Sequence, residues 1–227
     1  MQMPRSVEAL AVERLRQSEI ARKQRIEAGQ VIVNPVITIS RTAGSGGRII
    51  ARKLADDLGF SLWDKEIIDA IARRSEMPQE VVRAFDEKTI SEVTLLIYAV
   101  LGKHDLTGFM YLKHLTRMAA AIASVGNAVI LGRGVNFLLP NALNVRLDAS
   151  LDIRIANMMR YESDDREAAE RKIRESDRER RRFVERTFGA DRVKAFHYDV
   201  SLWMDKFTAP GAADIIKAAY REFYQSD

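Results

Sequence analysis

The sequence contains no cysteine, only three histidines, and no run of about 18 uncharged apolar residues. Without cysteine the chain forms neither disulfide bonds nor thiolate metal sites. His104, His114 and His197 lie far apart in the sequence, so we expect no histidine-based metal site. The lack of a long apolar run argues against a membrane-spanning helix, and the first residues show no apolar secretion signal. These absences predict a cytoplasmic protein that does not enter the membrane.

The remaining composition is typical of one large domain with a small appendage. Of the 227 residues, 47% are hydrophobic and 30% are charged, which is enough for both a core and a polar surface. The formal net charge of +4 favours an anionic partner. Much of the charge lies in residues 160–192, which read either as a solvated helix with ion pairs or as a source of phosphate-binding arginines. No aromatic stacking motif accompanies the basic residues, so a nucleic-acid partner is not expected.

Apolar and β-branched runs alternate with amphipathic segments along most of the chain. Such alternation predicts a parallel sheet with helices on both faces, because parallel strands need crossover connections. The expected fold class is therefore α/β with three layers and a parallel five-stranded sheet. The predicted strands cover 36–39, 60–63, 128–131, 144–147 and 198–203, and the predicted helices around them cover 49–58, 64–74, 151–160, 166–187 and 212–224.

Two helical regions stand outside this alternation. Residues 4–29 predict an amphipathic helix with a thin apolar stripe, so we separate an N-terminal helical extension (1–30) from the main domain (31–227). Such a helix packs on its own domain or on a second copy, and a homodimer through this helix is one prediction. Residues 75–126 contain no predicted strand and read as a helical insertion.

A glycine-rich loop lies between the first predicted strand and the helix that follows it. There, glycines let the backbone turn successive N–H groups toward one point, and the helix N-terminus adds its positive dipole end. A plain strand-to-helix turn is the alternative, but the flanking arginines favour a polyphosphate site. The expected nucleotide-binding residues are Ser40, Arg41, Thr42, Ala43, Gly44, Ser45, Gly46, Gly47 and Arg48.

The loop departs from the standard P-loop pattern G-x-x-x-x-G-K-[ST]. If Gly46 is the last glycine of the pattern, Arg41 replaces the first glycine and Gly47 replaces the lysine. Arg48 then replaces the serine or threonine that holds magnesium, so Arg41 or Arg48 is expected to supply the lost positive charge. No residue clearly replaces the lost hydroxyl, although Ser40, Thr42 and Ser45 lie near.

Four segments, taken in order, resemble the cytidylate-kinase-like family, which is related to the P-loop nucleoside monophosphate kinases. These segments are 39–48, 60–68, 129–134 and 177–180, and the resemblance extends over about residues 34–225. It implies a P-loop NTPase-type fold in which 75–126 is the insertion and 163–192 is an arginine-bearing lid. It also implies a phosphotransferase that moves the γ-phosphate of ATP, carried with Mg²⁺, to a nucleoside monophosphate or another small acceptor.

The resemblance carries over to individual residues only in part. In cytidylate kinases, an Asp-Gly-Arg-Asp turn after the third strand holds the acceptor phosphate; here Arg133 is kept but both carboxylates are absent. Asp177 and Arg180 match a lid pair that contacts the acceptor nucleoside, or they form a simple i,i+3 pair on a helix. Asp64 reads equally well as a ligand or as a helix N-cap. The expected substrate-binding residues are Asp64, Arg133, Asp177 and Arg180, and the expected catalytic residues are Arg133, Arg180, Arg41 and Arg48, with no metal bound directly by side chains.

Two other functions remain open at this point. The missing lysine also fits a non-catalytic nucleotide- or phosphate-binding regulator that has lost turnover. A basic interaction module, acting through the N-terminal helix and the arginine-rich segment, is the third possibility. Trp63, Trp203 and Phe207 are expected in the core and not as platforms for stacking a base.

Overall fold

The computed structural model describes residues 34–72, 106–162 and 165–225, together with isolated helical positions between residues 9 and 27. Most of the expected N-terminal helix 4–29, and with it the predicted dimer contact, lies outside the described residues. The helices expected within 73–105 lie outside them as well. Within the described ranges, no helix is both long enough and apolar enough to cross a membrane.

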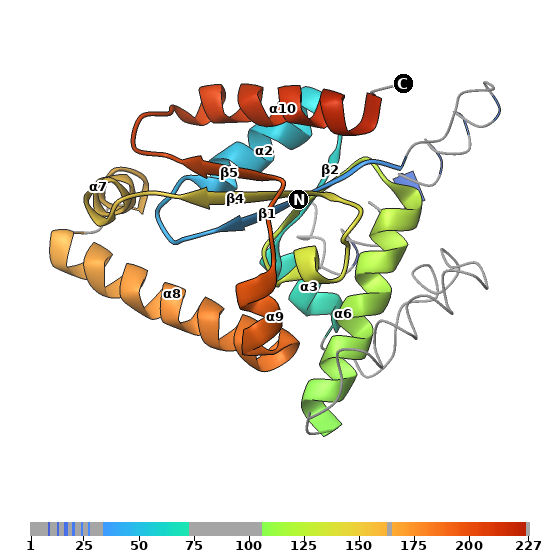
Figure 1. The fold of residues 1–227 in the computed structure, drawn as a ribbon, viewed down its shortest axis with the longest axis horizontal. Coiled ribbons are helices and arrows are strands. Elements are labelled where there is room, and N and C mark those ends of the chain that lie inside the picture. The colour runs from blue at the N-terminus through green and yellow to red at the C-terminus, as the bar shows by residue number, and fades with distance from the viewer. Residues whose placement is uncertain are drawn as a thin grey trace, which may run out of the picture.

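Five strands form one parallel sheet, as the sequence predicts, in the order β2-β3-β1-β4-β5 (Figure 1). β1 lies at the centre and pairs with both β3 and β4, so the loop that follows β1 leaves the middle of the sheet. The strands are β1 Val36–Arg41, β2 Ser61–Trp63, β3 Ala128–Leu131, β4 Leu143–Asp148 and β5 Val200–Trp203.

Helices cover both faces of this sheet and complete a three-layer α/β fold (Figure 1). α2 and α10 lie on one face, whereas α3 and α6 lie on the other. α8 crosses the molecule below the sheet and is followed at once by α9. The helices are α2 Gly47–Leu58, α3 Lys65–Ala72, α6 Leu106–Val125, α7 Leu151–Glu162, α8 Arg166–Phe188, α9 Ala190–Ala195 and α10 Ala209–Gln225, with a 3₁₀ turn η1 at Val135–Phe137.

The period-two alternation of β1 divides the core into two halves. Ile37 and Ile39 pack against α2 and α10, whereas Val36 points to the opposite face with Leu115 of α6. All of these side chains are buried, and each contributes roughly 1.5–3 kcal/mol of hydrophobic stabilisation. The buried side chains between α6 and the sheet form one half of the core, so α6 is part of the main fold. The sheet in turn fixes the positions of the groups at its carboxyl edge.

Two local predictions differ from the structure. Trp63 is buried as expected, but Trp203 and Phe207 are 57% and 43% exposed, so their assignment to the core is wrong. Trp203 ends β5 at the edge of the sheet, where alternate residues face outward. The last helix begins at Ala209, earlier than expected, because the Thr208 hydroxyl accepts a hydrogen bond from the amide of Gly211 and caps it.

Candidate functional site

The glycine loop joins β1 to α2 at the carboxyl edge of the sheet, as the sequence predicts. Gly44 and Gly46 have φ angles of 79° and 84°, a left-handed conformation that glycine adopts without steric cost. Gly46 is the N-cap of α2, and its carbonyl accepts hydrogen bonds from the amides of Ile49 and Ile50. The first N–H groups of α2 have no partner within the helix, so they and the helix dipole are arranged as an anion site at this loop would require.

Helix α7 holds the first half of the loop in place. The Arg154 Nε donates to the carbonyl of Ala43 at 2.7 Å, and the Asn157 amide donates to the carbonyl of Gly44 at 2.8 Å. A Cβ at Gly44 would lie 2.6 Å from the Arg154 carbonyl oxygen, so the backbones approach as closely as glycine allows. These contacts hold the loop backbone at Ala43 and Gly44 against α7.

The hydroxyl groups near the loop differ in how they are used. The Ser45 hydroxyl donates to the carbonyl of Thr42 at 3.0 Å, and Ser45 is 1% exposed, so this hydroxyl supports the loop from within. The Ser40 hydroxyl donates to the side-chain oxygen of Asn136 at 3.2 Å. The buried Thr42 hydroxyl has no hydrogen-bond partner among the described residues. Of the three hydroxyls suggested by the sequence, Thr42 therefore has the most capacity for a ligand.

The turn after β3 projects Arg133 in an unusual conformation. Gly132, Arg133 and Gly134 have successive φ angles of 85°, 59° and 65°, and only Arg133 bears a Cβ in this left-handed region. The Arg133 guanidinium forms an ion pair with Asp69 of α3 and lies 4.8 Å from the centroid of the Phe183 ring. Its Nε is buried without a hydrogen-bond partner among the described residues. Sequence reasoning found the arginine but missed the distant carboxylate that anchors it.

Arg41 ends β1 beneath the lid and is the most perturbed charge of the site. Burial, followed by the neighbouring Arg180, Arg48 and Arg133, lowers the pKa of Arg41 to about 9. Glu66 acts in the opposite direction, but the Glu66 carboxylate is itself paired with Arg48. In the described part of the chain no carboxylate forms an ion pair with the Arg41 guanidinium, so its charge is left for a ligand to balance.

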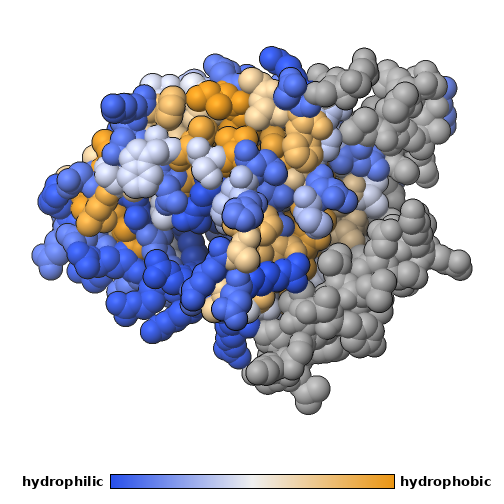
Figure 2. Space-filling model, viewed as in Figure 1, coloured by the Kyte–Doolittle hydropathy of each residue, from blue (hydrophilic) through white to orange (hydrophobic). Residues whose placement is uncertain are grey.

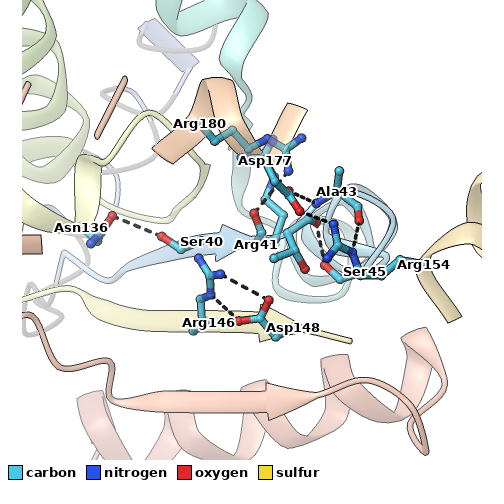
Figure 3. Close-up of polar contacts among 11 residues, drawn as sticks. Ser40, Arg41, Ala43, Ser45, Asn136, Arg146, Asp148, Arg154, Asp177 and Arg180 are labelled. Carbon is cyan, nitrogen blue, oxygen red and sulfur yellow. Dashed lines mark hydrogen bonds and ion pairs between the residues drawn. The ribbon is translucent and has the colours of Figure 1, made fainter. Parts of the chain in front are cut away.

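The lid helix α8 is bound directly to the loop (Figure 3). The Asp177 carboxylate accepts a hydrogen bond from the amide of Ala43 at 2.9 Å and forms an ion pair with Arg154. Arg180 donates to the carbonyl of Arg41 at 3.2 Å, and burial is the main cause that lowers the pKa of Arg180. Both residues of the lid motif therefore have their partners in the loop and in α7.

The loop, the Arg133 turn and α8 surround one cavity of about 380 Å³. Figure 2 shows hydrophilic side chains gathered over α8, at the lower left of the view. In Figure 3, Ser40 of β1 lies between Asn136 and Arg146, and all three residues line the cavity. The lining includes Arg41, Arg133, Arg146, Arg180 and Lys65, with the rings of Phe137, Phe183 and Tyr198.

Seven residues expected in the site lie outside the cavity lining: Ala43, Gly44, Ser45, Gly46, Gly47, Arg48 and Asp64. The Arg48 side chain is 66% exposed and pairs with Glu66 at 3.1 Å, so of the two arginines flanking the loop only Arg41 reaches the cavity. The Asp64 carboxylate accepts a hydrogen bond from the amide of Ile67 at 3.2 Å and caps α3. The alternative reading of Asp64 as an N-cap thus matches its contact in this structure.

Besides Asp69, the residues that sequence reasoning missed include Arg146, Asn136 and Arg154. Arg146 lies on β4 and pairs with Asp148 at 2.8 Å; an arginine inside a strand of mostly buried residues was the available signal. Asn136 is 2% exposed, and its amide nitrogen has no partner among the described residues. Arg154 occupies an ordinary helix position, so nothing in the sequence distinguishes it.

Comparison with known proteins agrees with this geometry. The chain is 27% identical to the cytidylate kinase of Pyrococcus furiosus over 186 residues, which cover 81% of this chain and 87% of that protein. It is 26% identical to the cytidylate kinase of Pyrococcus abyssi over 192 residues, which cover 84% and 96%. An uncharacterized protein from Eubacterium ventriosum has a similar fold, with a TM-score of 0.53 at 20% identity over 82% of this chain and 98% of that chain.

The family match covers all the parts of the cavity just described. The profile of the cytidylate kinase-like family matches residues 36–206, which contain the glycine loop, the Arg133 turn and the lid helix. Because this match spans most of the chain, the protein belongs to the cytidylate kinase-like family.

Proposed function

We propose that this protein is a phosphotransferase that moves the γ-phosphoryl group of ATP to a small phosphorylated acceptor. One observation carries the proposal: Arg41 of β1, Arg133 after β3 and Arg180 of α8 line one cavity, together with Thr42 at the start of the glycine loop. Phosphoryl transfer requires in-line positioning of the two substrates and positive charge around the moving group. A buried cluster of arginines next to a helix N-terminus supplies both of these requirements.

The glycine loop, Arg133 and Arg180 would each bind a different part of the two substrates. The loop amides and the N-terminus of α2 would bind the donor phosphates. Arg133 would bind the acceptor phosphate, because ligands of open α/β sheets lie at the carboxyl ends of the strands and because its left-handed backbone aims the guanidinium from the turn. Arg180, on the lid, would cover the transferred group from the opposite side.

Magnesium fits this site as an ion carried by the nucleotide. The described residues contain no group of three or more carboxylate, histidine or cysteine side chains placed to hold a metal ion. Thr42 lines the cavity, and its buried hydroxyl has no hydrogen-bond partner among the described residues, so after a side-chain rotation it is the protein group most suited to contact the ion. When bound, the ion would neutralise charge on the donor phosphates.

The acceptor is defined by its phosphate more than by a base. Asp177, which matches the family residue that contacts the acceptor nucleoside, is bound to Ala43 and Arg154. The carboxylates that flank the turn arginine in cytidylate kinases are absent here, where Gly132 and Gly134 surround Arg133. CMP is the first acceptor to test because the relatives bear that name, but the panel must extend to other nucleoside monophosphates and to small sugar phosphates.

A non-catalytic nucleotide-binding regulator is the second candidate, since Gly47 stands where a P-loop has its lysine. ATP binding with and without magnesium, followed by ADP formation with the acceptor panel, separates the two. The kinase proposal predicts magnesium-dependent binding and acceptor-dependent ADP formation. Tight ATP binding without turnover on any acceptor would favour the regulator.

A further inference from the structure

Arg41 fills a slot that two glycines leave open. A Cβ at Gly47, the first residue of α2, would lie 2.8 Å from Cγ and 3.0 Å from Cβ of Arg41. On the other side, a Cβ at Gly132 would overlap the Arg41 guanidinium. The left-handed backbone of Gly132 favours glycine by itself, but Gly47 has no positive φ. Space for the Arg41 side chain is therefore the reason that residue 47 is glycine.

These two residues occupy linked positions of the P-loop pattern. Arg41 stands at the first position, where the pattern has glycine, and Gly47 stands at the seventh, where it has lysine. The two departures compensate each other, because the side chain lost at the seventh position makes room for the one gained at the first. We infer that Arg41 is the functional counterpart of the P-loop lysine and contacts the β- and γ-phosphates of the donor nucleotide.

The surroundings of Arg41 support this role. Its backbone is paired with β4 at Leu147 and its carbonyl is bound by Arg180, so the side chain starts from a rigid point. The guanidinium lines the cavity beside Arg133, and no described carboxylate forms an ion pair with it. A guanidinium binds two phosphate oxygens at once, which a lysine ammonium does less well. Arg48, the other arginine next to the loop, is already paired with Glu66.

Moving the positive charge from residue 41 to residue 47, where a P-loop has its lysine, tests the inference. The inference rests on the donor-phosphate site proposed above. Arg41→Gly removes the guanidinium, and the double variant Arg41→Gly/Gly47→Lys restores the first and seventh positions of the standard pattern, with Arg48 unchanged in both variants. We expect Arg41→Gly to lower phosphoryl transfer about 100- to 1000-fold and the double variant to recover at least about tenfold of this loss. Gly47→Lys alone should bind ATP poorly, because its stem meets the Arg41 side chain. Arg52→Ala, which removes an exposed arginine of α2, is the control and should match the parent.

A binding measurement makes the test independent of turnover. Calorimetric titration with ATP and with ADP gives the gain in affinity due to the γ-phosphate. This gain should shrink in Arg41→Gly and return in the double variant. If the parent phosphorylates no acceptor, the kinase proposal fails but this gain still decides the role of Arg41. An unchanged ATP-to-ADP ratio in folded Arg41→Gly, or a folded double variant no better than the single one, would overturn the inference.

Arg41→Lys covers the case in which Arg41→Gly does not fold. Lysine keeps the charge and most of the stem but loses the bidentate contact. We expect Arg41→Lys to keep the melting temperature and to lower phosphoryl transfer at least about tenfold. The gain in affinity from ADP to ATP should also be smaller than in the parent. A lower melting temperature with unchanged ATP and ADP affinities would show a structural role and contradict the inference.

Discussion

The side chain of Asp177 and the amide of Ala43 are joined by a hydrogen bond of 2.9 Å, although 134 residues separate them in the sequence. This bond fastens the lid helix α8 to the phosphate loop. The same carboxylate forms an ion pair with Arg154, which in turn donates to the carbonyl of Ala43. One turn further along α8, Arg180 donates a hydrogen bond to the carbonyl of Arg41. Asp177 is thus a positioning residue in this conformation.

Removing this carboxylate should therefore weaken transfer for every acceptor alike. Loss of a hydrogen bond to a charged group costs about 1.5–3 kcal/mol, which is roughly a 10- to 150-fold change. We expect Asp177→Ala to lower kcat within this range and Asp177→Asn to lower it less, since the amide oxygen still accepts from Ala43. Steady-state kinetics with matched ribose and deoxyribose acceptors measures this effect.

The control for Asp177 is Glu170→Ala, which removes a carboxylate of the same helix that pairs with Arg174 outside the cavity. Its kinetics should equal those of the parent. A loss in Asp177→Ala confined to the ribose acceptor would mean that Asp177 contacts the acceptor sugar, as the family resemblance implied.

The two glycines that cap α2 offer a matched test of the loop. Gly46 at the N-terminus and Gly59 at the C-terminus have φ angles of 84° and 65°, so valine at either position strains the backbone. Both Gly46→Val and Gly59→Val should lower the melting temperature by comparable amounts. Only Gly46→Val should abolish ATP binding in calorimetry, because its side chain stands where phosphate approaches the loop. Nothing lies within 4 Å of a Cβ at Gly59, so the Gly59→Val variant should still bind ATP. Equal affinities in the two variants would remove the loop from the nucleotide site.

The lowered pKa of Arg41 predicts how ATP binding depends on pH. Its folded-state pKa of about 9 lies well below the ordinary value of an arginine, so the folded protein binds fewer protons between these two values. The destabilisation caused by the buried charge is therefore complete below about pH 9 and is relieved as the pH rises through this window. A bound phosphate favours the charged form and raises the pKa.

ATP affinity should consequently fall above about pH 9, where free Arg41 loses its proton. Titrations between about pH 7.5 and about pH 10 should show a steeper fall for the parent than for Arg41→Gly. The same pH profile in both proteins would show that Arg41 does not contact the nucleotide.

Local patterns were sufficient to predict the sheet and the loop. The β-branched run of β1 and the apolar run of β3 mark buried strands, and the glycine cluster marks the turn between β1 and α2. The distinction between Arg41 and Arg48 was not accessible, because both flank the loop in sequence. It depends on which side chain fits between Gly47 and Gly132 in the folded chain.

Long-range partners were also beyond the reach of sequence reasoning. Asp69 stands 64 residues before Arg133, and no local pattern connects the two. The exposure of Trp203 depends on β5 being an edge strand, which only the strand order shows. Thr208 did carry a local signal, since threonine is a preferred N-cap.

The effect of substituting Arg133 on stability depends on its ion-pair partner, Asp69. Arg133 and Asp69 have side-chain exposures of 13% and 14%, so removing Arg133 takes the opposite charge away from a nearly buried carboxylate, which keeps its hydrogen bond from Tyr111. We expect Arg133→Ala to lower the melting temperature and the double variant Arg133→Met/Asp69→Asn to regain much of this loss. Thermal unfolding of both variants checks this. If the double variant is no more stable than Arg133→Ala, the ion pair does not explain the destabilisation.

The acceptor role of Arg133 is the central claim, and transfer of the labelled γ-phosphate from ATP to the acceptor tests it most directly. Parent, Arg133→Met/Asp69→Asn and the control Arg52→Ala, which removes an exposed arginine of α2 outside the cavity lining, are compared as folded proteins. Losing a charge-assisted contact to phosphate costs about 2–4 kcal/mol, or a rate loss of roughly 30- to 1000-fold. We predict this loss in the double variant, with ATP affinity within about threefold of the parent and with normal transfer by the control. A parent that transfers phosphate to no acceptor, or a double variant that transfers it at the parental rate, would contradict the account.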